Sequence, residues 1–451
     1  MSYESILKVK IIKLLLIFSY VICWLSVSTS FDDLLILKEN QSFNLINIAN
    51  FLRHSLVYLC LFLLLLLIFF LKKSFFSKKN LIFHFFIIYL LAQIPGLIIS
   101  KNPIENISFV VSSLTLTLTI IFIDHFFSSI EKRIFIFISL IILASVFFIT
   151  FIPHFIDFLN GGGYFYGFYQ KSEIFFDKIS PRSSGLARTS LVILLIIHVI
   201  ENFLDKAKKN IFLFRFLKII FLTCILLFQS RTIIFLTIIS YLLIFVFDNK
   251  ITFKNFLKFF FTYFIIPLFI MIVLANINQY KSTTKSLVDY SLQEKFSHFF
   301  DSASNKKQNL RSIDPDISSG RFNDWVRILD SVSEKYVYFG YGAQGDRHII
   351  NQTASNGLLY AYSSSGIFGL FFYLSFSILI SYRLLKVMIY SFRDQKNNYI
   401  YCIIVLVIIL RSLLESSYSV FSIDFLVLMT TLIKFNMISV SISDIKTKFL
   451  K

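Results

Sequence analysis

The sequence predicts an all-α, polytopic integral membrane protein with about twelve transmembrane helices and one large external loop bearing short helices. Of its 451 residues, 56% are hydrophobic, and the mean hydropathy is +0.74. Apolar runs of about 17 residues or more recur along the chain, and each is long enough to cross about 30 Å of hydrocarbon. The runs are continuous rather than alternating, which excludes an outer-membrane β-barrel.

Six apolar spans are expected in the first half of the chain. The third contains Pro95 and Gly96, which predict a kink. The first follows three lysines and resembles a signal peptide, but an uncleaved span gives a consistent topology. The expected ranges are 11–28, 55–71, 81–99, 107–123, 134–152 and 186–200.

The apolar block 211–247 predicts a helical hairpin. As one helix it would be about 55 Å long, nearly twice the thickness of the hydrocarbon. Its polar break is Gln229-Ser230-Arg231-Thr232. An arginine at mid-bilayer costs about 2.5–3.5 kcal/mol, so the chain is expected to turn there, with Arg231 at a membrane face.

Four further spans complete the predicted topology, with both termini cytoplasmic. The lysine-dense loops then all fall on the inner side, so the positive-inside rule explains most of the net charge of +18 without a nucleic-acid partner. One membrane domain, 1–451, carries external loops at 153–185 and 276–356. The spans are 259–275, 357–380, 399–410 and 420–433.

Four arginines are predicted on the external side, outside the lysine-rich loops: Arg182, Arg231, Arg321 and Arg347. A guanidinium group stays charged and offers a planar fork to phosphate oxygens. Such groups beside membrane spans suit a lipid-linked diphosphate, on which negative charge develops as a sugar is transferred. The alternatives are an interfacial anchor for Arg231 and solvated loop charges for the others.

The second external loop holds the candidate active site. Trp325, Ile328, Leu329 and Val332 recur at helical spacing, and Arg321 shares their face, so we expect an amphipathic helix at the membrane surface. Candidate general bases there are His348, Asp346, Asp324 and Glu334, although a lone loop histidine is more often uninvolved. His154 and Asp157 are a second possibility. The four cysteines lie in apolar runs, and neither a metal site nor a cofactor is predicted.

In order, five motifs resemble the O-antigen ligase/polymerase superfamily. They are Arg182-Ser183-Ser184-Gly185, Ser230-Arg231-Thr232, Ser319-Gly320-Arg321 with Trp325, Gly340-Tyr341-Gly342, and Asn356 opening the next span. The resemblance implies a glycosyltransferase of the bacterial inner membrane that uses undecaprenyl-diphosphate-linked glycans on its periplasmic face. By that resemblance, Arg231 and Arg321 are catalytic and bind the donor diphosphate, with Arg182 assisting.

The ligase branch carries a histidine before that asparagine, whereas this chain has Ser355-Asn356. The departure favours a Wzy-type polymerase of O-antigen, capsule or exopolysaccharide over a ligase acting on lipid A-core or protein. It leaves the general base unassigned, and among the candidates His348 is expected to be catalytic. Arg347, Tyr341 and Asn356 are the substrate-binding candidates. Membrane lipid is an expected partner, and a flippase and a chain-length regulator follow from the resemblance. The rival from another class is a flippase or transporter of lipid-linked glycans.

Overall fold

The computed structural model describes residues 3–27, 45–70, 81–100, 103–128, 130–160, 183–204, 211–248, 252–296, 321–350, 353–394 and 399–433. All regular secondary structure within these ranges is helical, which confirms the predicted all-α class. Most of loop 153–185 lies outside the described residues, as do Arg182, Ser319 and Gly320.

The first half of the chain forms six long helical segments, one of which is broken. The third segment turns after α5 and resumes as the short 3-10 helix η3 at Pro95, where the sequence predicts a kink. The segments are α1 (Tyr3–Val27), α3 (Leu45–Phe70), α5 (Leu81–Leu91) with η3 (Pro95–Ile99), α6 (Pro103–Phe126), α7 (Arg133–Leu159) and α8 (Ser183–Phe203).

The second half contains the predicted hairpin and the helices of the large loop. The hairpin turns at the polar residues between α9 (Ile211–Leu227) and α10 (Arg231–Asp248), as expected. The remaining elements are α11 (Phe253–Phe260), the π-helical turn η5 (Phe261–Ile265), α12 (Ile266–Phe296), α13 (Arg321–Lys335), α14 (Gly345–Ile350), α15 (Gly357–Asp394), α16 (Tyr399–Ser412), the 3-10 helix η6 (Ser417–Ser419) and a last helix, Ile423–Ile433.

Within the described residues, seven helices are long and apolar enough to cross a membrane, and four shorter apolar helices accompany them. Each of the twelve spans predicted from the sequence overlaps one or more of the helices above. The protein is therefore a multi-pass membrane protein.

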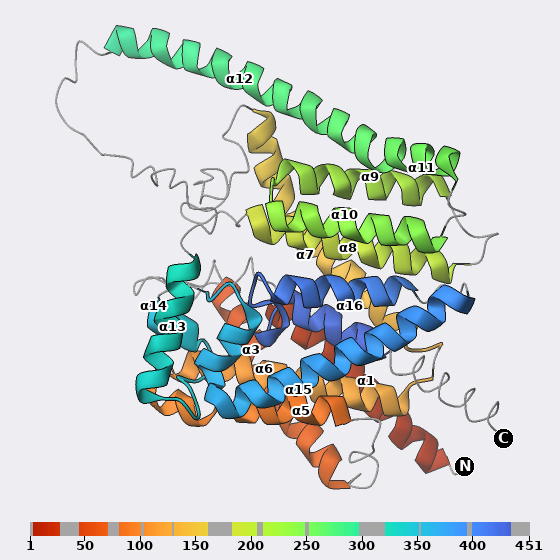
Figure 1. The fold of residues 1–451 in the computed structure, drawn as a ribbon, viewed down its shortest axis with the longest axis vertical. Coiled ribbons are helices and arrows are strands. Elements are labelled where there is room, and N and C mark those ends of the chain that lie inside the picture. The colour runs from red at the N-terminus through yellow and green to blue at the C-terminus, as the bar shows by residue number, and fades with distance from the viewer. Residues whose placement is uncertain are drawn as a thin grey trace.

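Several helices extend beyond the predicted spans, and the longest extension is at the ninth span. The ninth span was expected to end at 275, but α12 continues as a helix to Phe296, so the first part of loop 276–356 is helical. Hydropathy marks where a helix leaves the apolar layer rather than where the helix ends. In Figure 1, α12 runs along one edge of the bundle, and its end projects beyond α9 and α10.

Helices far apart in the sequence are joined inside the bundle by hydroxyl groups. The Tyr20 hydroxyl lies 2.6 Å from both Ser139 Oγ and Thr430 Oγ1, and so links α1, α7 and the last helix. Buried polar groups of membrane proteins need such partners because the hydrocarbon offers none. Aromatic rings fill the space between α5, α15 and the last helix, where Phe86 lies 4.6 Å from Phe376 and 5.1 Å from Phe425, centroid to centroid.

The two ends of the bundle differ in character. Helices α13 and α14 lie together at one end, beside the start of α15 (Figure 1). We call this the loop end. The first turn of α1 lies at the opposite end.

Candidate functional site

Two of the predicted arginines are each the first residue of a helix. Arg231 begins α10 and Arg321 begins α13. Unpaired N–H groups give a helix N-terminus a partial positive charge, which makes it an unfavourable place for a cation and a favourable one for an anion. Each arginine therefore adds its charge to a backbone that already attracts negative groups.

Helix α13 is held against the protein by the face that Arg321 shares. Ile328 and Val332 are fully buried, and they pack in a small core with Tyr341, Ala354 and Tyr360. This differs from the prediction that the apolar face would meet lipid headgroups. The residues beneath α13 come from α14, α15 and the connecting loops, which hydropathy alone does not reveal.

Two hydrogen bonds fix the first turns of α13. Trp325 Nε1 donates to the carbonyl oxygen of Ala354 at 2.9 Å. One turn earlier, a guanidinium N–H of Arg321 donates to the carbonyl oxygen of Leu414 at 3.4 Å. Arg321 is thus directed onto the turn that follows α16.

Asn356 reaches the same turn from α15. Its side-chain oxygen accepts hydrogen bonds from the backbone N–H groups of Leu358 and Leu359, which caps the helix at its N-terminus. Its amide nitrogen donates to the carbonyl oxygen of Leu413 at 3.1 Å. Two of the predicted site residues, Arg321 and Asn356, are therefore brought together on neighbouring carbonyl groups.

The Gly340-Tyr341-Gly342 segment has a packing role. Helix α15 is broken at Gly366, where φ is +63°, and a Cβ there would lie 2.3 Å from the carbonyl carbon of Tyr338. The N–H groups freed by the break donate to carbonyl oxygens of residues 337 and 338. Gly342 lies directly against the backbone of Gly96, at the predicted kink. The loop thus supplies backbone partners to a broken membrane helix.

Tyr341 and His348 lie side by side. Their ring centroids are 5.1 Å apart, and the Tyr341 hydroxyl donates to the carbonyl oxygen of Ser331 at 3.2 Å. Tyr341 is buried and His348 is partly buried, whereas Arg347 is exposed.

Asp346, one of the four base candidates, is buried and bonded to the backbone around it. Its carboxylate is fully buried and accepts hydrogen bonds from the backbone N–H of Arg347 at 2.9 Å and of Ala354 at 2.7 Å. Burial raises the pKa of this carboxyl to about 6, although the two N–H donors act against the shift. Asp346 therefore closes the loop between α14 and α15.

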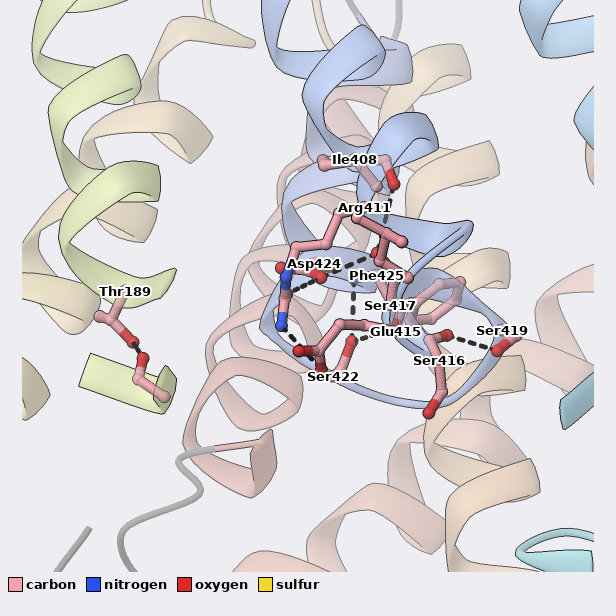
Figure 2. Close-up of polar contacts among 12 residues, drawn as sticks. Thr189, Ile408, Arg411, Glu415, Ser416, Ser417, Ser419, Ser422, Asp424 and Phe425 are labelled. Carbon is pink, nitrogen blue, oxygen red and sulfur yellow. Dashed lines mark hydrogen bonds and ion pairs between the residues drawn. The ribbon is translucent and has the colours of Figure 1, made fainter. Parts of the chain in front are cut away.

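A buried ion pair, which sequence reasoning passed over, lies next to the turn after α16. Arg411 pairs with Asp424 and lies 3.4 Å from Glu415, and Ser417 Oγ donates to Asp424 at 2.8 Å (Figure 2). Arg411, Asp424 and Ser417 are all buried. Ionisable residues in short apolar runs are the signal that points to such a pair.

The neighbouring helices reach the same cluster. A cavity of about 10 Å³, close to the space that one water needs, is lined by Arg188 of α8, Ile233 of α10, Arg411 and Asp424. Thr189, beside Arg188, donates its hydroxyl to the carbonyl oxygen of Gly185 in the same helix (Figure 2). Arg231 is two residues from Ile233, and its side chain is exposed. Arg231 therefore begins a helix that lines this cavity, and Arg321 bonds to the turn that follows Arg411.

Strained backbone marks the same region. Within the described residues, four non-glycine residues have positive φ: Gln229 (+51°), Gln344 (+60°), Ser355 (+51°) and Ser417 (+33°). They lie, in order, two residues before Arg231, two before Asp346, one before Asn356 and within η6. Such conformations cost about 1–3 kcal/mol each and cluster at functional sites. Sequence alone does not indicate these positive φ values, because neither serine nor glutamine is enriched in the left-handed region.

Comparison with known proteins assigns part of the chain. Residues 216–374 match the family Wzy_C, described as O-antigen ligase. The matched segment contains Arg231, Arg321, His348 and Asn356. No match was found among curated proteins. Members of the family are membrane enzymes of polysaccharide synthesis, of ligase or polymerase type, that transfer lipid-linked glycans. The chain therefore carries a Wzy_C O-antigen ligase domain at residues 216–374, as the ordered motifs predicted.

Proposed function

We propose that the protein is a Wzy-type polymerase that joins lipid-linked repeat units of an O-antigen, capsule or exopolysaccharide. It transfers the growing glycan from undecaprenyl diphosphate to the non-reducing end of the next lipid-linked unit. The site faces the periplasm, and both termini lie in the cytoplasm. A flippase that supplies the units and a regulator of chain length are its expected partners.

The observation that carries this proposal is the placement of Arg231 and Arg321. Arg321 begins α13 and bonds to the turn that follows α16. Arg231 begins α10, whose Ile233 lines a cavity beside Arg411. An arginine at a helix N-terminus attracts an anion through its guanidinium charge, and the dipole of the helix adds to that attraction. A diphosphate at the membrane surface has the charge and the position that this arrangement suits.

The reaction requires charge stabilisation on the leaving group. The acceptor hydroxyl oxygen forms a bond to the anomeric carbon of the donor, and the bond from that carbon to the diphosphate oxygen breaks. The diphosphate leaves with its lipid and with one more negative charge, which Arg231 and Arg321 stabilise. Removing one such stabilising group from an enzyme typically lowers kcat by about 100- to 1,000-fold.

The remaining site residues are assigned by position. His348 is our candidate for the base that takes the proton of the acceptor hydroxyl, because it is partly buried at the loop end and near Arg347. Arg347 is exposed, so it can meet a charged group of the glycan or its carrier. Asn356 holds the start of α15 beside Arg321. Tyr341 supports the ring of His348. Arg182 assists at the diphosphate.

A ligase is the second candidate, because the matched family is described by that activity. Position 355 favours the polymerase. It holds a serine in a strained conformation, with φ +51°, where the ligase branch carries its histidine. A serine hydroxyl there does not replace an imidazole as a base near neutral pH.

Glycan profiling separates these functions. A strain lacking the gene, complemented with the wild type, Arg231→Ala, Arg321→Ala or Arg327→Ala, is analysed for glycan length on its carrier lipid and on the final acceptor. Arg327 is an exposed arginine of α13 and serves as the matched control. A polymerase predicts single-repeat glycans in both site variants and normal chains in the control.

Each other outcome contradicts the proposal in its own way. Full-length polymer that stays on the carrier lipid indicates a ligase. Repeat units that accumulate on the cytoplasmic leaflet indicate a flippase. Normal chain length in both site variants excludes a catalytic role for the two arginines.

A further inference from the structure

The turn that holds Arg321 and Asn356 is itself built around an ion pair. Arg411 lies in the last turn of α16, and Asp424 lies in the first turn of the last helix. A cation is favoured at a helix C-terminus and an anion at an N-terminus, so each side chain complements the dipole of its own helix. Their pairing then joins the two helix ends across the turn.

Further hydrogen bonds fix the course of the chain between them. Ser417 Oγ donates to the Asp424 carboxylate at 2.8 Å, and Ser422 Oγ donates to the carbonyl oxygen of Ser417 at 2.6 Å. Ser422 also accepts from the backbone N–H of Phe425 and so caps the last helix. Ser417 keeps a positive φ of +33° within this network, a conformation that persists only when its surroundings impose it.

The same turn presents the two carbonyl groups that bind the Wzy_C segment. Leu413 and Leu414 lie two and three residues after Arg411, and their oxygens accept from Asn356 and Arg321. Their own N–H groups bond back to Leu410 and Arg411. The direction of both carbonyl groups therefore depends on how Arg411 is held.

A buried ion pair is poor evidence for a contribution to stability. The desolvation of two charges offsets most of their attraction, and apolar replacements are often as stable. Such pairs do impose one arrangement on the groups around them in some proteins. Here that arrangement includes the residue proposed to hold the donor diphosphate.

We propose that Arg411 and Asp424, which lie outside the matched segment 216–374, are positioning residues for Arg321. The pair holds the turn 412–417 so that the Leu414 carbonyl directs the Arg321 guanidinium toward the substrate. The structural part of the proposal stands on the contacts alone, and its catalytic consequence rests on the proposed function.

Chemical labelling tests the structural part without any activity. Purified protein in lipid nanodiscs is treated with phenylglyoxal, and the modification of Arg321 and Arg327 is followed by mass spectrometry. In Asp424→Asn, the modification rate of Arg321 should rise about fivefold relative to that of Arg327. A change of this size is expected when the hydrogen bond from Arg321 to Leu414 is lost. Arg411→Lys, which keeps the cation but not the two-sided fork, should give a smaller rise.

The matched control removes a carboxylate from another ion pair. Glu201 of α8 pairs with the buried Lys218 of α9, about 20 Å along α8 from Arg188. Glu201→Gln should leave Arg321 labelling unchanged. An unchanged Arg321 rate in both Asp424→Asn and Arg411→Lys overturns the proposal, and so does an equal rise in Glu201→Gln.

Chain extension by the purified protein tests the catalytic part. Asp424→Asn should lower kcat/KM for a lipid-linked repeat unit by about 10- to 100-fold, because a small misplacement of a charged group has effects of that size. In an Arg321→Ala background the same change should have almost no further effect, since the residue that it positions is gone. An equal loss in both backgrounds means that the pair acts on folding alone, which contradicts positioning. If the wild type extends no glycan, the proposed function fails while the labelling result still decides the structural claim.

Discussion

Arg321 and Asn356 donate hydrogen bonds to adjacent carbonyl groups, those of Leu414 and Leu413, at 3.4 Å and 3.1 Å. Arg321 starts α13 and Asn356 caps α15, so these two helices of the Wzy_C segment begin on one turn. That turn belongs to a part of the chain beyond residue 374, where the family match ends. The site is therefore assembled from the matched segment and from the turn that follows α16.

Substitutions at Asn356 separate its two roles. Asn356→Ala removes the helix cap and the bond to Leu413, and should lower stability by about 0.5–2 kcal/mol. Asn356→Asp keeps a capping oxygen but has no donor for Leu413. We expect thermal unfolding near that of the wild type for the aspartate variant, with shortened glycans in both. Normal chain length in Asn356→Asp would show that the bond to Leu413 is not needed.

Alanine at Gly366 should destabilise the loop end. The residue has φ +63°, and an added Cβ would lie 2.3 Å from the carbonyl carbon of Tyr338. The conformational strain alone costs about 1–2 kcal/mol, and the clash with backbone adds to it. Thermal unfolding of the purified variant measures the loss. Gly185→Ala is the control, because nothing lies within 4 Å of its Cβ position and alanine is favoured in a helix.

The loop between α14 and α15 should become more stable as the pH falls from 7 to 5. The folded state raises the pKa of Asp346 to about 6 from 3.8, so the folded protein binds a proton more readily than the unfolded chain. The stabilisation is complete below the unfolded pKa and is lost as the pH rises through 6. Its slope reaches about 1.4 kcal/mol per pH unit.

Trp325 provides a local probe of this effect, since its indole bonds to Ala354, whose N–H bonds to Asp346. Denaturation is followed by Trp325 emission in a Trp24→Phe background at pH 7 and pH 5. Asp346→Asn should remove the difference between the two pH values. A pH effect that persists in Asp346→Asn would belong to another group, with His348 the first to examine.

The spans were predictable because they depend on local properties. Apolar length and lysine-rich ends locate the helices, and the energetic penalty of a buried Arg231 predicts the hairpin between α9 and α10. The family followed from motifs in order, and the match to residues 216–374 confirms it. Helix α13 forms as predicted, and Ile328 and Val332 of its apolar face are buried, whereas Leu329 is exposed.

What the sequence left undetermined depends on contacts between distant segments. Hydropathy does not show that α12 continues to Phe296, because a helix need not end where it leaves the membrane. The pairing of Arg411 with Asp424 depends on a turn between two short helices. The support that loop 337–341 gives to the break in α15 depends on a close approach of two backbones. The roles of Arg231, Arg321, Arg347, His348 and Asn356 stay predictions.

In the proposed reaction, Arg231 and Arg321 together stabilise a lipid diphosphate as it leaves. The most direct measurement is the rate at which purified protein, reconstituted with a defined lipid-linked repeat unit, forms glycosidic bonds and releases the lipid diphosphate. We expect one diphosphate released per bond formed, a loss of about 100-fold or more in Arg231→Ala and in Arg321→Ala, and an unchanged rate in Arg327→Ala. Bond formation at the wild-type rate by either site variant would contradict this role of the two arginines.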